Sequence, residues 1–135
     1  MRVSILTSSR ADFGIYLPLL KSLNKDSYFD LNIIAFGTHL SQDYGFTIDN
    51  ILEEGFNIGH KVNTILGDTP KEISKSMALT INEFAKVWDI EKEKTKIIIC
   101  LGDRYEMFAA VISSIPFNIP VAHIHGGETT LGAID

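Results

Sequence analysis

The chain has 135 residues, of which 17 are acidic and 12 are basic, and its formal net charge is -5. A hydrophobic fraction of 45% at this length predicts one folded domain and excludes a disordered chain. The acidic balance, without a basic stripe, argues against a nucleic-acid-binding protein. Cys100 is the only cysteine, which excludes an internal disulfide. Because the sequence shows neither signal-peptide anatomy nor the ~18 consecutive apolar residues of a membrane span, we expect a cytoplasmic protein that does not bind membranes.

The first part of the chain alternates between short apolar runs and an amphipathic stretch. Residues 2–7 (RVSILT) and 29–37 (FDLNIIAFG) predict two strands, because both runs are short, branched and apolar. Residues 11–26 between them predict a helix, with Pro18 near its first turn. The apolar face of that helix is expected to contain Ile15, Leu19, Leu20 and Leu23.

The middle of the chain predicts short helical pieces at residues 39–45 and 46–55, followed by a weaker strand at 56–62. Residues 66–90 predict the clearest helix of the chain. Its start combines a threonine N-cap with a proline in the first turn, and its apolar residues recur on one face, which we assign to the core. These start and core residues are Thr69, Pro70, Ile73, Met77, Ile81, Phe84 and Trp88.

The last part of the chain completes the pattern of an α/β fold. Residues 96–102 (KIIICLG) are continuously apolar, as in a strand buried on both faces, and are followed by a helix at 105–115 and a strand at 119–125. Five strands with intervening helices predict a Rossmann-like open parallel sheet with helices on both faces. Right-handed crossovers, with a reversal after the third strand, predict the strand order 3-2-1-4-5.

Polar residues gather where the predicted strands end. In open parallel sheets, ligands bind at the carboxyl ends of the strands, near the point where the strand order reverses. The predicted order places Arg10 and Asp103 on either side of that point. One site therefore accounts for all five loops, which contain Ser8, Ser9, Arg10, Gly37, Thr38, His39, Asn63, Thr64, Gly67, Asp68, Gly102, Asp103, Arg104, His125, Gly126, Gly127 and Glu128.

Single residues of this predicted site also have structural interpretations. Arg10, beside two serines at a helix start, suits a phosphate or another anion, and a surface ion pair is the alternative. Asp103 is a candidate catalytic carboxylate, and it also fits the N-cap of the next helix. We expect Glu106 to face solvent or to support the first turn of its helix. His60 is assigned a structural role, and Cys100 is interpreted as a small buried hydrophobe.

Two histidines near the end of the chain allow two interpretations. His123 and His125 are two residues apart, so on a strand both side chains would point to the same face. With Glu128 or Asp103 they could bind a divalent metal ion in a hydrolase, but no third ligand has a diagnostic spacing. The alternative is a His123 satisfied in the core and a His125 that faces a substrate.

The glycines of HGGE are not followed by Gly-Lys-Ser/Thr, and no G-x-G-x-x-G follows the first strand. Neither a Walker loop nor an NAD site is therefore predicted. Asp103, Glu128 and Asp135 are three carboxylates that could share a cleft with an arginine, an arrangement suited to acid–base chemistry. The residues alone predict an α/β enzyme that acts on an anionic substrate by proton transfer.

The blocks TSSRADFGIYLPLL, FGTHLSQDYGFTIDNI, LGDRYEMFAA and HIHGGETTLGAID follow one another over essentially the whole chain. Together they resemble the hydrolysing UDP-N-acetylglucosamine 2-epimerases, in particular the bacterial branch for sialic-acid biosynthesis and its relatives that act on diacetamido sugars. The resemblance implies one half of a two-domain, glycosyltransferase-B-like fold with the active site between the domains. Residues 1–135 would then be the N-terminal Rossmann-like domain, a fragment that is inactive without the C-terminal nucleotide-binding domain.

The resemblance also implies a reaction, in which UDP-N-acetylglucosamine and water give N-acetylmannosamine and UDP through a glycal, without a metal ion or other cofactor. It assigns catalytic roles to Asp103 and Asp135, and to His125 or Glu128, because His125 stands where much of the wider family has a catalytic glutamate. The implied substrate-binding residues are Arg10 near the diphosphate, His39 in the sugar cleft, and Gly102, Arg104, Gly126 and Gly127. The full-length protein is expected to bind a UDP-sugar and to form homo-oligomers.

Two other classes of function stay open at this point. One is a metal-dependent hydrolase built on His123, His125 and an acid, for which zinc content and loss of activity with a chelator would argue. The other is a non-catalytic module that binds nucleotide sugars, for which tight binding without a partner domain would argue.

Overall fold

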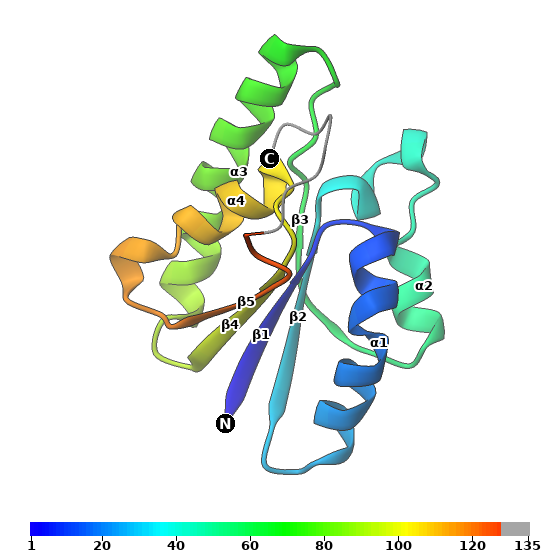
Figure 1. Ribbon diagram of the computed structural model, residues 1–135, viewed down its shortest axis with the longest axis vertical. Helices are drawn as coiled ribbons and strands as arrows, with labels where there is room; N and C mark the ends of the chain where they lie inside the picture. The colour runs from blue at the N-terminus through cyan, green and yellow to red at the C-terminus, as the bar shows by residue number, and fades with distance from the viewer. Residues whose placement is uncertain (128–135) are drawn as a thin grey trace.

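The chain folds around one parallel β-sheet, and the structure, a computed structural model, describes residues 1–127 (Figure 1). The helices and strands, in chain order, are β1 (Arg2–Thr7), α1 (Arg10–Lys25), β2 (Asp30–Phe36), α2 (Ile48–Glu53), β3 (Ile58–Val62), α3 (Pro70–Glu91), β4 (Thr95–Leu101), α4 (Tyr105–Ile112) and β5 (Val121–Ile124). Short 3-10 helices lie at Gly37–Leu40, Gln42–Tyr44 and Ile115–Phe117. The strand order is β3-β2-β1-β4-β5, with every neighbouring pair parallel. This confirms the predicted Rossmann-like α/β fold and its strand order.

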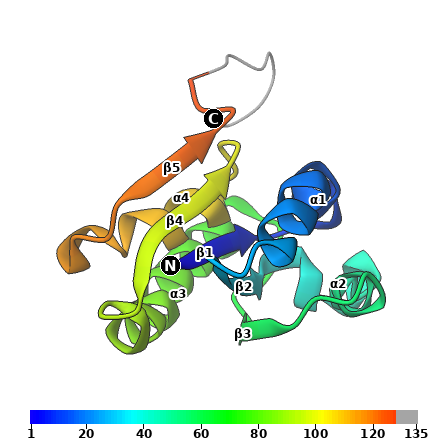
Figure 2. The same ribbon diagram turned by 90° about the horizontal axis from the view of Figure 1, so that it is seen from below.

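The helices cover the two faces of the sheet separately. α1 and α2 pack on one face, and α3 and α4 pack on the other (Figures 1 and 2). On the α3 and α4 face, Phe84 contacts both Phe36 and Trp88, and the Trp88 indole donates to the carbonyl of Ala110 at 3.2 Å. On the other face, Phe13 packs edge-on against Phe56. The switch from one face to the other falls after β3, as right-handed crossovers require for this strand order.

The start of α3 agrees with the sequence prediction, but the buried face of the helix does not. Thr69 caps the helix in a capping box with Glu72, and Pro70 is its first residue. Phe84 and Trp88 are in the core as predicted, whereas Ile81 is 41% exposed. The buried positions earlier in the helix are Ser76 and Thr80, whose side chains are small. The Ser76 hydroxyl accepts the backbone N–H of Leu66, and the Thr80 hydroxyl donates to the carbonyl of Ser76.

Helix α1 shows a similar rotation of its buried face. Phe13, Tyr16 and Leu20 are buried, whereas the predicted core residue Ile15 is 56% exposed. Pro18 lies in the middle of the helix rather than near its first turn. The helix continues through the proline because packing of the buried face, rather than local propensity, supplies most of its stability.

Strand β4 is buried on one face only, although its continuous apolar run predicted burial on both faces. In β4, Ile98 and Cys100 are buried on the α3 and α4 face, whereas Ile97 and Ile99 on the opposite face are only half-buried. The apolar run in β4 therefore indicates two apolar faces, of which α1 and α2 cover one incompletely. Within residues 1–127, no helix combines the length and the apolar character that a membrane crossing needs.

Candidate active site

The loops that follow the five strands lie together at the carboxyl ends of the strands (Figure 1). β1 and β4 are neighbours within the sheet. α1 begins at Arg10 directly after β1, and α4 begins at Tyr105 directly after β4. Because α1 and α4 pack on opposite faces, the two loops diverge at the point where the strand order reverses. The predicted placement of Arg10 and Asp103 on either side of this point is correct.

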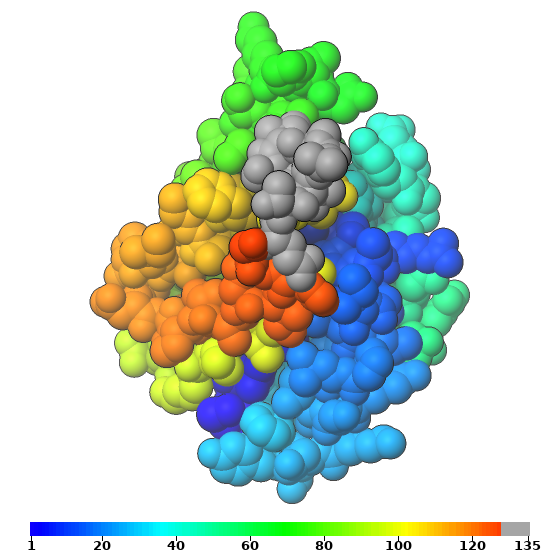
Figure 3. All heavy atoms as spheres, viewed as in Figure 1, coloured from blue at the N-terminus to red at the C-terminus, as the bar shows by residue number. Residues whose placement is uncertain are grey.

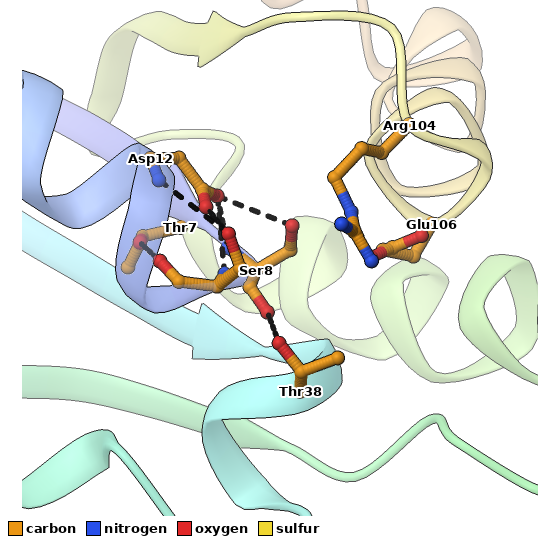
Figure 4. Close-up of polar contacts among 7 residues, drawn as sticks. Thr7, Ser8, Asp12, Thr38, Arg104 and Glu106 are labelled. Carbon is orange, nitrogen blue, oxygen red and sulfur yellow. Dashed lines mark hydrogen bonds and ion pairs between the residues drawn. The ribbon is translucent and has the colours of Figure 1, made fainter. Parts of the chain in front are cut away.

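The loop between β1 and α1 is organised by Asp12, which the sequence analysis did not single out. The Asp12 carboxylate accepts the backbone N–H of Ser8 at 2.6 Å and of Ser9 at 3.2 Å. It also accepts the hydroxyls of both serines, with the Ser8 hydroxyl at 3.1 Å (Figure 4). Burial raises the pKa of Asp12, and the hydrogen bonds from Ser8 and Ser9 oppose that shift. The Ser-x-x-Asp spacing of a capping box is the signal that could have identified this residue.

The loop after β2 is fixed to the loop after β1 through the carbonyl of Ser8. This carbonyl accepts the Thr38 hydroxyl at 2.9 Å (Figure 4). It also accepts the His39 backbone N–H at 3.3 Å. Gly37 has a φ of +60°, and a Cβ there would lie 2.9 Å from the Ser8 oxygen. Only glycine therefore fits at position 37 without moving the two loops apart.

His39 is enclosed by this arrangement. Its Nε2 is 2.9 Å from the Thr7 hydroxyl, its Nδ1 is 2.9 Å from the Thr47 hydroxyl, and the residue is 0% exposed. Burial lowers the pKa of His39 from 6.5 to about 4, so the ring is neutral at physiological pH. The ring holds three segments of the chain together, and contact with a sugar stays a prediction.

Because the pKa of His39 is lowered on folding, its contribution to the free energy of unfolding depends on pH. The folded ring stays neutral down to a pKa of about 4, whereas the unfolded ring takes up a proton below 6.5. The contribution of His39 is therefore complete above the unfolded pKa and is lost as the pH falls towards the folded one, by up to about 3 kcal/mol. Urea unfolding across this pH range should show the stability gap between the wild type and His39→Gln narrowing as the pH falls. A constant gap would contradict this assignment.

The loop after β4 carries Asp103 on a fixed backbone. Gly102 has a φ of +73°, its N–H donates to the carbonyl of Ile124 at 2.9 Å, and its carbonyl is 2.6 Å from Nε2 of His123. These two contacts fasten the loop to β5. The N-cap of α4 is Arg104, not Asp103, so the alternative role of Asp103 as a cap is wrong. The Asp103 side chain is exposed at the edge of the sheet.

Arg104 and Glu106 form an ion pair in the first turn of α4. Arg104 Nε lies 2.6 Å from Glu106 Oε1 (Figure 4). The Arg104 side chain is half-exposed, but that of Glu106 is almost completely buried, so the prediction that Glu106 faces solvent is wrong. Burial alone lowers the pKa of Arg104, but the nearby carboxylates, Glu106 foremost, outweigh it and raise the pKa.

The histidines of the last strand do not follow the predicted alternation. β5 ends at Ile124, and His125 has a φ of +54°, so the two-residue period of a strand does not extend to it. His123 is exposed and contacts Gly102, so it is not a core histidine. A Cβ on Gly126 would lie 2.4 Å from Nδ1 of His123, which explains the glycine at this position. Gly127 has a φ of +87°.

A comparison with known protein families identifies the family of this chain. The sequence profile of the UDP-N-acetylglucosamine 2-epimerase family matches residues 21–135. The chain belongs to this family.

Individual relatives agree with the 2-epimerase assignment. The chain is 36% identical over 135 residues to the GDP/UDP-N,N'-diacetylbacillosamine 2-epimerase (hydrolyzing) of Campylobacter jejuni, covering 99% of this chain and 34% of the relative. It is 35% identical to the UDP-N,N'-diacetylbacillosamine 2-epimerase (hydrolyzing) of Legionella pneumophila, covering 99% of this chain and 35% of that relative. The chain therefore spans about a third of the length of these relatives.

A solved structure of a 2-epimerase shares the fold. The crystal structure of UDP-GlcNAc 2-epimerase from Neisseria meningitidis bound to UDP-GlcNAc superimposes with a TM-score of 0.78 at 17% identity. The match covers 98% of this chain and 34% of the Neisseria chain. At this identity the likeness shows the fold alone, which is Rossmann-like.

Some of the predicted site residues line one of two separate hollows. A cavity of about 1020 Å³ between α3, α4 and the ends of β4 and β5 has Gly102, Asp103, Arg104 and His123 along one side. Its other side is apolar and includes the start of α3, which projects past the rest of the molecule (Figures 1 and 3). Arg10 lines a separate, smaller groove between α1 and α2, beside Glu53 and Glu54.

Of the other predicted site residues, His39, His125, Gly126 and Gly127 line neither hollow, and Glu128 and Asp135 lie outside the described residues. Within residues 1–127, no group of three or more His, Cys, Asp or Glu side chains is placed to hold a metal ion. Cys100 is buried in β4, and burial raises the pKa of its thiol to about 11, consistent with its interpretation as a small hydrophobe.

Proposed function

We propose that the chain is the N-terminal domain of a hydrolysing UDP-N-acetylglucosamine 2-epimerase that forms N-acetylmannosamine and UDP, for the synthesis of sialic-acid-type sugars. The observation that supports this most directly is the family match over residues 21–135, combined with an exposed carboxylate, Asp103, beside the reversal of strand order. We further propose a cytoplasmic homo-oligomer that needs no metal ion or other cofactor.

The proposed reaction removes the proton from carbon 2 of the sugar as UDP leaves, and water then adds to the glycal with inverted configuration at carbon 2. Such a reaction needs a base at carbon 2, a group that delivers the new proton, and positive charge near the departing diphosphate. We assign acid–base roles to Asp103 and Asp135, with His125 or Glu128 as a further proton-transfer group. Arg10 and Arg104, each at the start of a helix, supply cations and backbone N–H groups that suit phosphate oxygens.

The glycines and His39 complete the proposed binding site. Gly102, Gly126 and Gly127 allow the backbone to approach a ligand closely, because a side chain at these positions would be strained or would clash. His39 is proposed to shape the sugar cleft by fixing the loops after β1 and β2.

A UDP-diacetamido sugar is the second candidate substrate. Two relatives at 36% and 35% identity are named for diacetylbacillosamine, whereas the Neisseria meningitidis UDP-N-acetylglucosamine 2-epimerase is 28% identical. A third relative at 35% identity is the Polysialic acid biosynthesis protein P7 of Escherichia coli. These names support both sugars, so the test includes both.

A proton NMR time course in deuterated water tests the proposal. The full-length protein is incubated with UDP-N-acetylglucosamine and, separately, with UDP-N,N'-diacetylbacillosamine, and the 135-residue chain is assayed in parallel. We expect the full-length protein to release a 2-epimeric sugar that carries deuterium at carbon 2, and the short chain to release none. Product without deuterium at carbon 2, or no turnover of either sugar, would contradict the proposed reaction.

A further inference from the structure

Glu106 is a buried carboxylate that the proposed reaction does not use. It is 0% exposed although it lies in the first turn of α4, two residues after Arg104. Its Oε1 accepts the Nε–H of Arg104 at 2.6 Å, and its Oε2 has no hydrogen-bond partner among residues 1–127. A buried carboxylate costs stability unless it is paired, and Glu106 is paired with one half-exposed cation, Arg104.

The loops after β1 and β2 lie against the Glu106 side chain. A Cβ on Gly37 would lie 3.5 Å from Cγ of Glu106 and 2.9 Å from the Ser8 carbonyl, so the loops after β1 and β2 close around the glutamate. The Ser8 carbonyl is in turn held by Thr38. Figure 4 shows the Arg104 side chain lying across Glu106 on the side that faces Ser8.

The contact through Nε determines the orientation of the arginine. A guanidinium is planar, so a hydrogen bond donated by Nε–H fixes the plane of the group and the direction of its terminal nitrogens. Arg104 follows Asp103 directly and lines the same cavity. An arginine fixed in this way presents its terminal N–H groups in one geometry, without a further loss of side-chain freedom when an anion binds.

We propose that Glu106 is a positioning residue, which holds the Arg104 guanidinium in the geometry that binds the phosphate oxygens of the UDP-sugar. This inference rests on the proposed function, because that function places Arg104 in the substrate site. Glu106 itself transfers no proton and does not touch the substrate.

The test is a double-mutant cycle in the full-length protein. The kcat/KM for the UDP-sugar is measured for Glu106→Ala, Glu106→Gln, Arg104→Ala and the double variant Glu106→Ala/Arg104→Ala. Glu106→Ala should lower kcat/KM by up to about 100-fold, because a misplaced binding group costs roughly that factor. In the Arg104→Ala background the same change should alter kcat/KM by no more than about twofold. Glu83→Ala, which removes a surface ion pair with Lys86, is the matched control and should leave kcat/KM unchanged.

Glu106→Gln separates positioning from proton transfer. Glutamine keeps an oxygen that can accept the Nε–H of Arg104, so kcat/KM should fall less than about fivefold, as expected when a charge-assisted hydrogen bond becomes a neutral one. A Glu106→Gln variant as inactive as Glu106→Ala would contradict this, because it would show that an oxygen accepting the Nε–H of Arg104 is not what Glu106 contributes. Independent effects of Glu106 and Arg104, or wild-type activity in Glu106→Ala, would also overturn the proposal.

A spectroscopic measurement keeps this inference separate from the proposed function. In 15N-edited NMR spectra of this chain, the chemical shift of the Arg104 Nε–H should differ from that of a solvent-exposed arginine, and its exchange with water should be slow. Glu106→Ala should remove both effects. Glu83→Ala should preserve them. If the full-length protein turns over neither sugar, the proposed function fails, and the NMR result still decides whether Glu106 holds Arg104. An unchanged Arg104 signal in Glu106→Ala would refute the positioning role.

Discussion

Replacing Asp103 with asparagine in the full-length protein is expected to lower kcat by roughly 100- to 10,000-fold, the range that positioned acid–base groups contribute. The side chain is exposed at the carboxyl end of β4, and the backbone that carries it is held by Gly102 contacts to Ile124 and His123. Asparagine has nearly the same shape but cannot accept a proton at neutral pH. The substitution should therefore remove the chemistry and leave the loop in place.

Stability and isotope exchange check the interpretation of that variant. Asp103 does not cap α4, so the free energy of unfolding should change by less than about 0.5 kcal/mol, as for other exposed positions. Asp89→Asn, near the opposite end of α3, is the matched control and should retain wild-type turnover. Turnover and deuterium incorporation at wild-type rates in Asp103→Asn would remove Asp103 from the mechanism.

The sequence predicted the sheet well because its signals are local and repeated. β1 has the predicted bounds, Thr69 and Pro70 start α3, and handedness then leaves one simple strand order. The helix faces were less predictable. Ser76 and Tyr16 are buried where aliphatic periodicity pointed elsewhere, because the space between a helix and its neighbours decides which side chains fit there.

In the candidate active site, too, local sequence signals were predictive, whereas contacts between residues far apart in the sequence were not. Polar residues after each strand indicated its location, because parallel strands bring their carboxyl ends to one edge. Burial of Glu106 could not be predicted, because it depends on Gly37, a residue far away in the sequence, leaving space beside it. The left-handed backbone of His125 also has no sequence signal, since non-glycine residues rarely adopt it.

Glu91 forms a second buried polar cluster, at the end of the sheet opposite the site. Its side chain is 3% exposed, and its carboxylate lies 2.8 Å from His60 Nε2 and 3.1 Å from Arg2 Nε. The Arg2 contact is an ion pair without the alignment of a hydrogen bond. The Thr95 hydroxyl donates to the same carboxylate at 3.3 Å. The cluster therefore joins β1, β3, β4 and α3, and the structural role predicted for His60 is confirmed.

Glu91→Ala is expected to lower the free energy of unfolding by about 3 kcal/mol, the lower part of the range for a broken buried ion pair. The lower part applies because Arg2 and His60 are 26% and 20% exposed, and because Asp30 remains 3.6 Å from Arg2. Urea unfolding of this chain should show a lower midpoint with an unchanged m-value. Glu83→Ala, which removes an ion pair at the surface, should shift the midpoint little.

The size of the Glu91 effect decides how α3 is joined to the strands of the sheet. A loss below about 1 kcal/mol would mean that solvent compensates the cluster as it does a surface ion pair, and that apolar packing alone joins α3 to β1 and β3. A loss near the expected value with a reduced m-value would mean that the native state had loosened, because m follows the surface exposed on unfolding. Only a lower midpoint at constant m fits a buried carboxylate that holds four elements together at the end of the sheet opposite the candidate site.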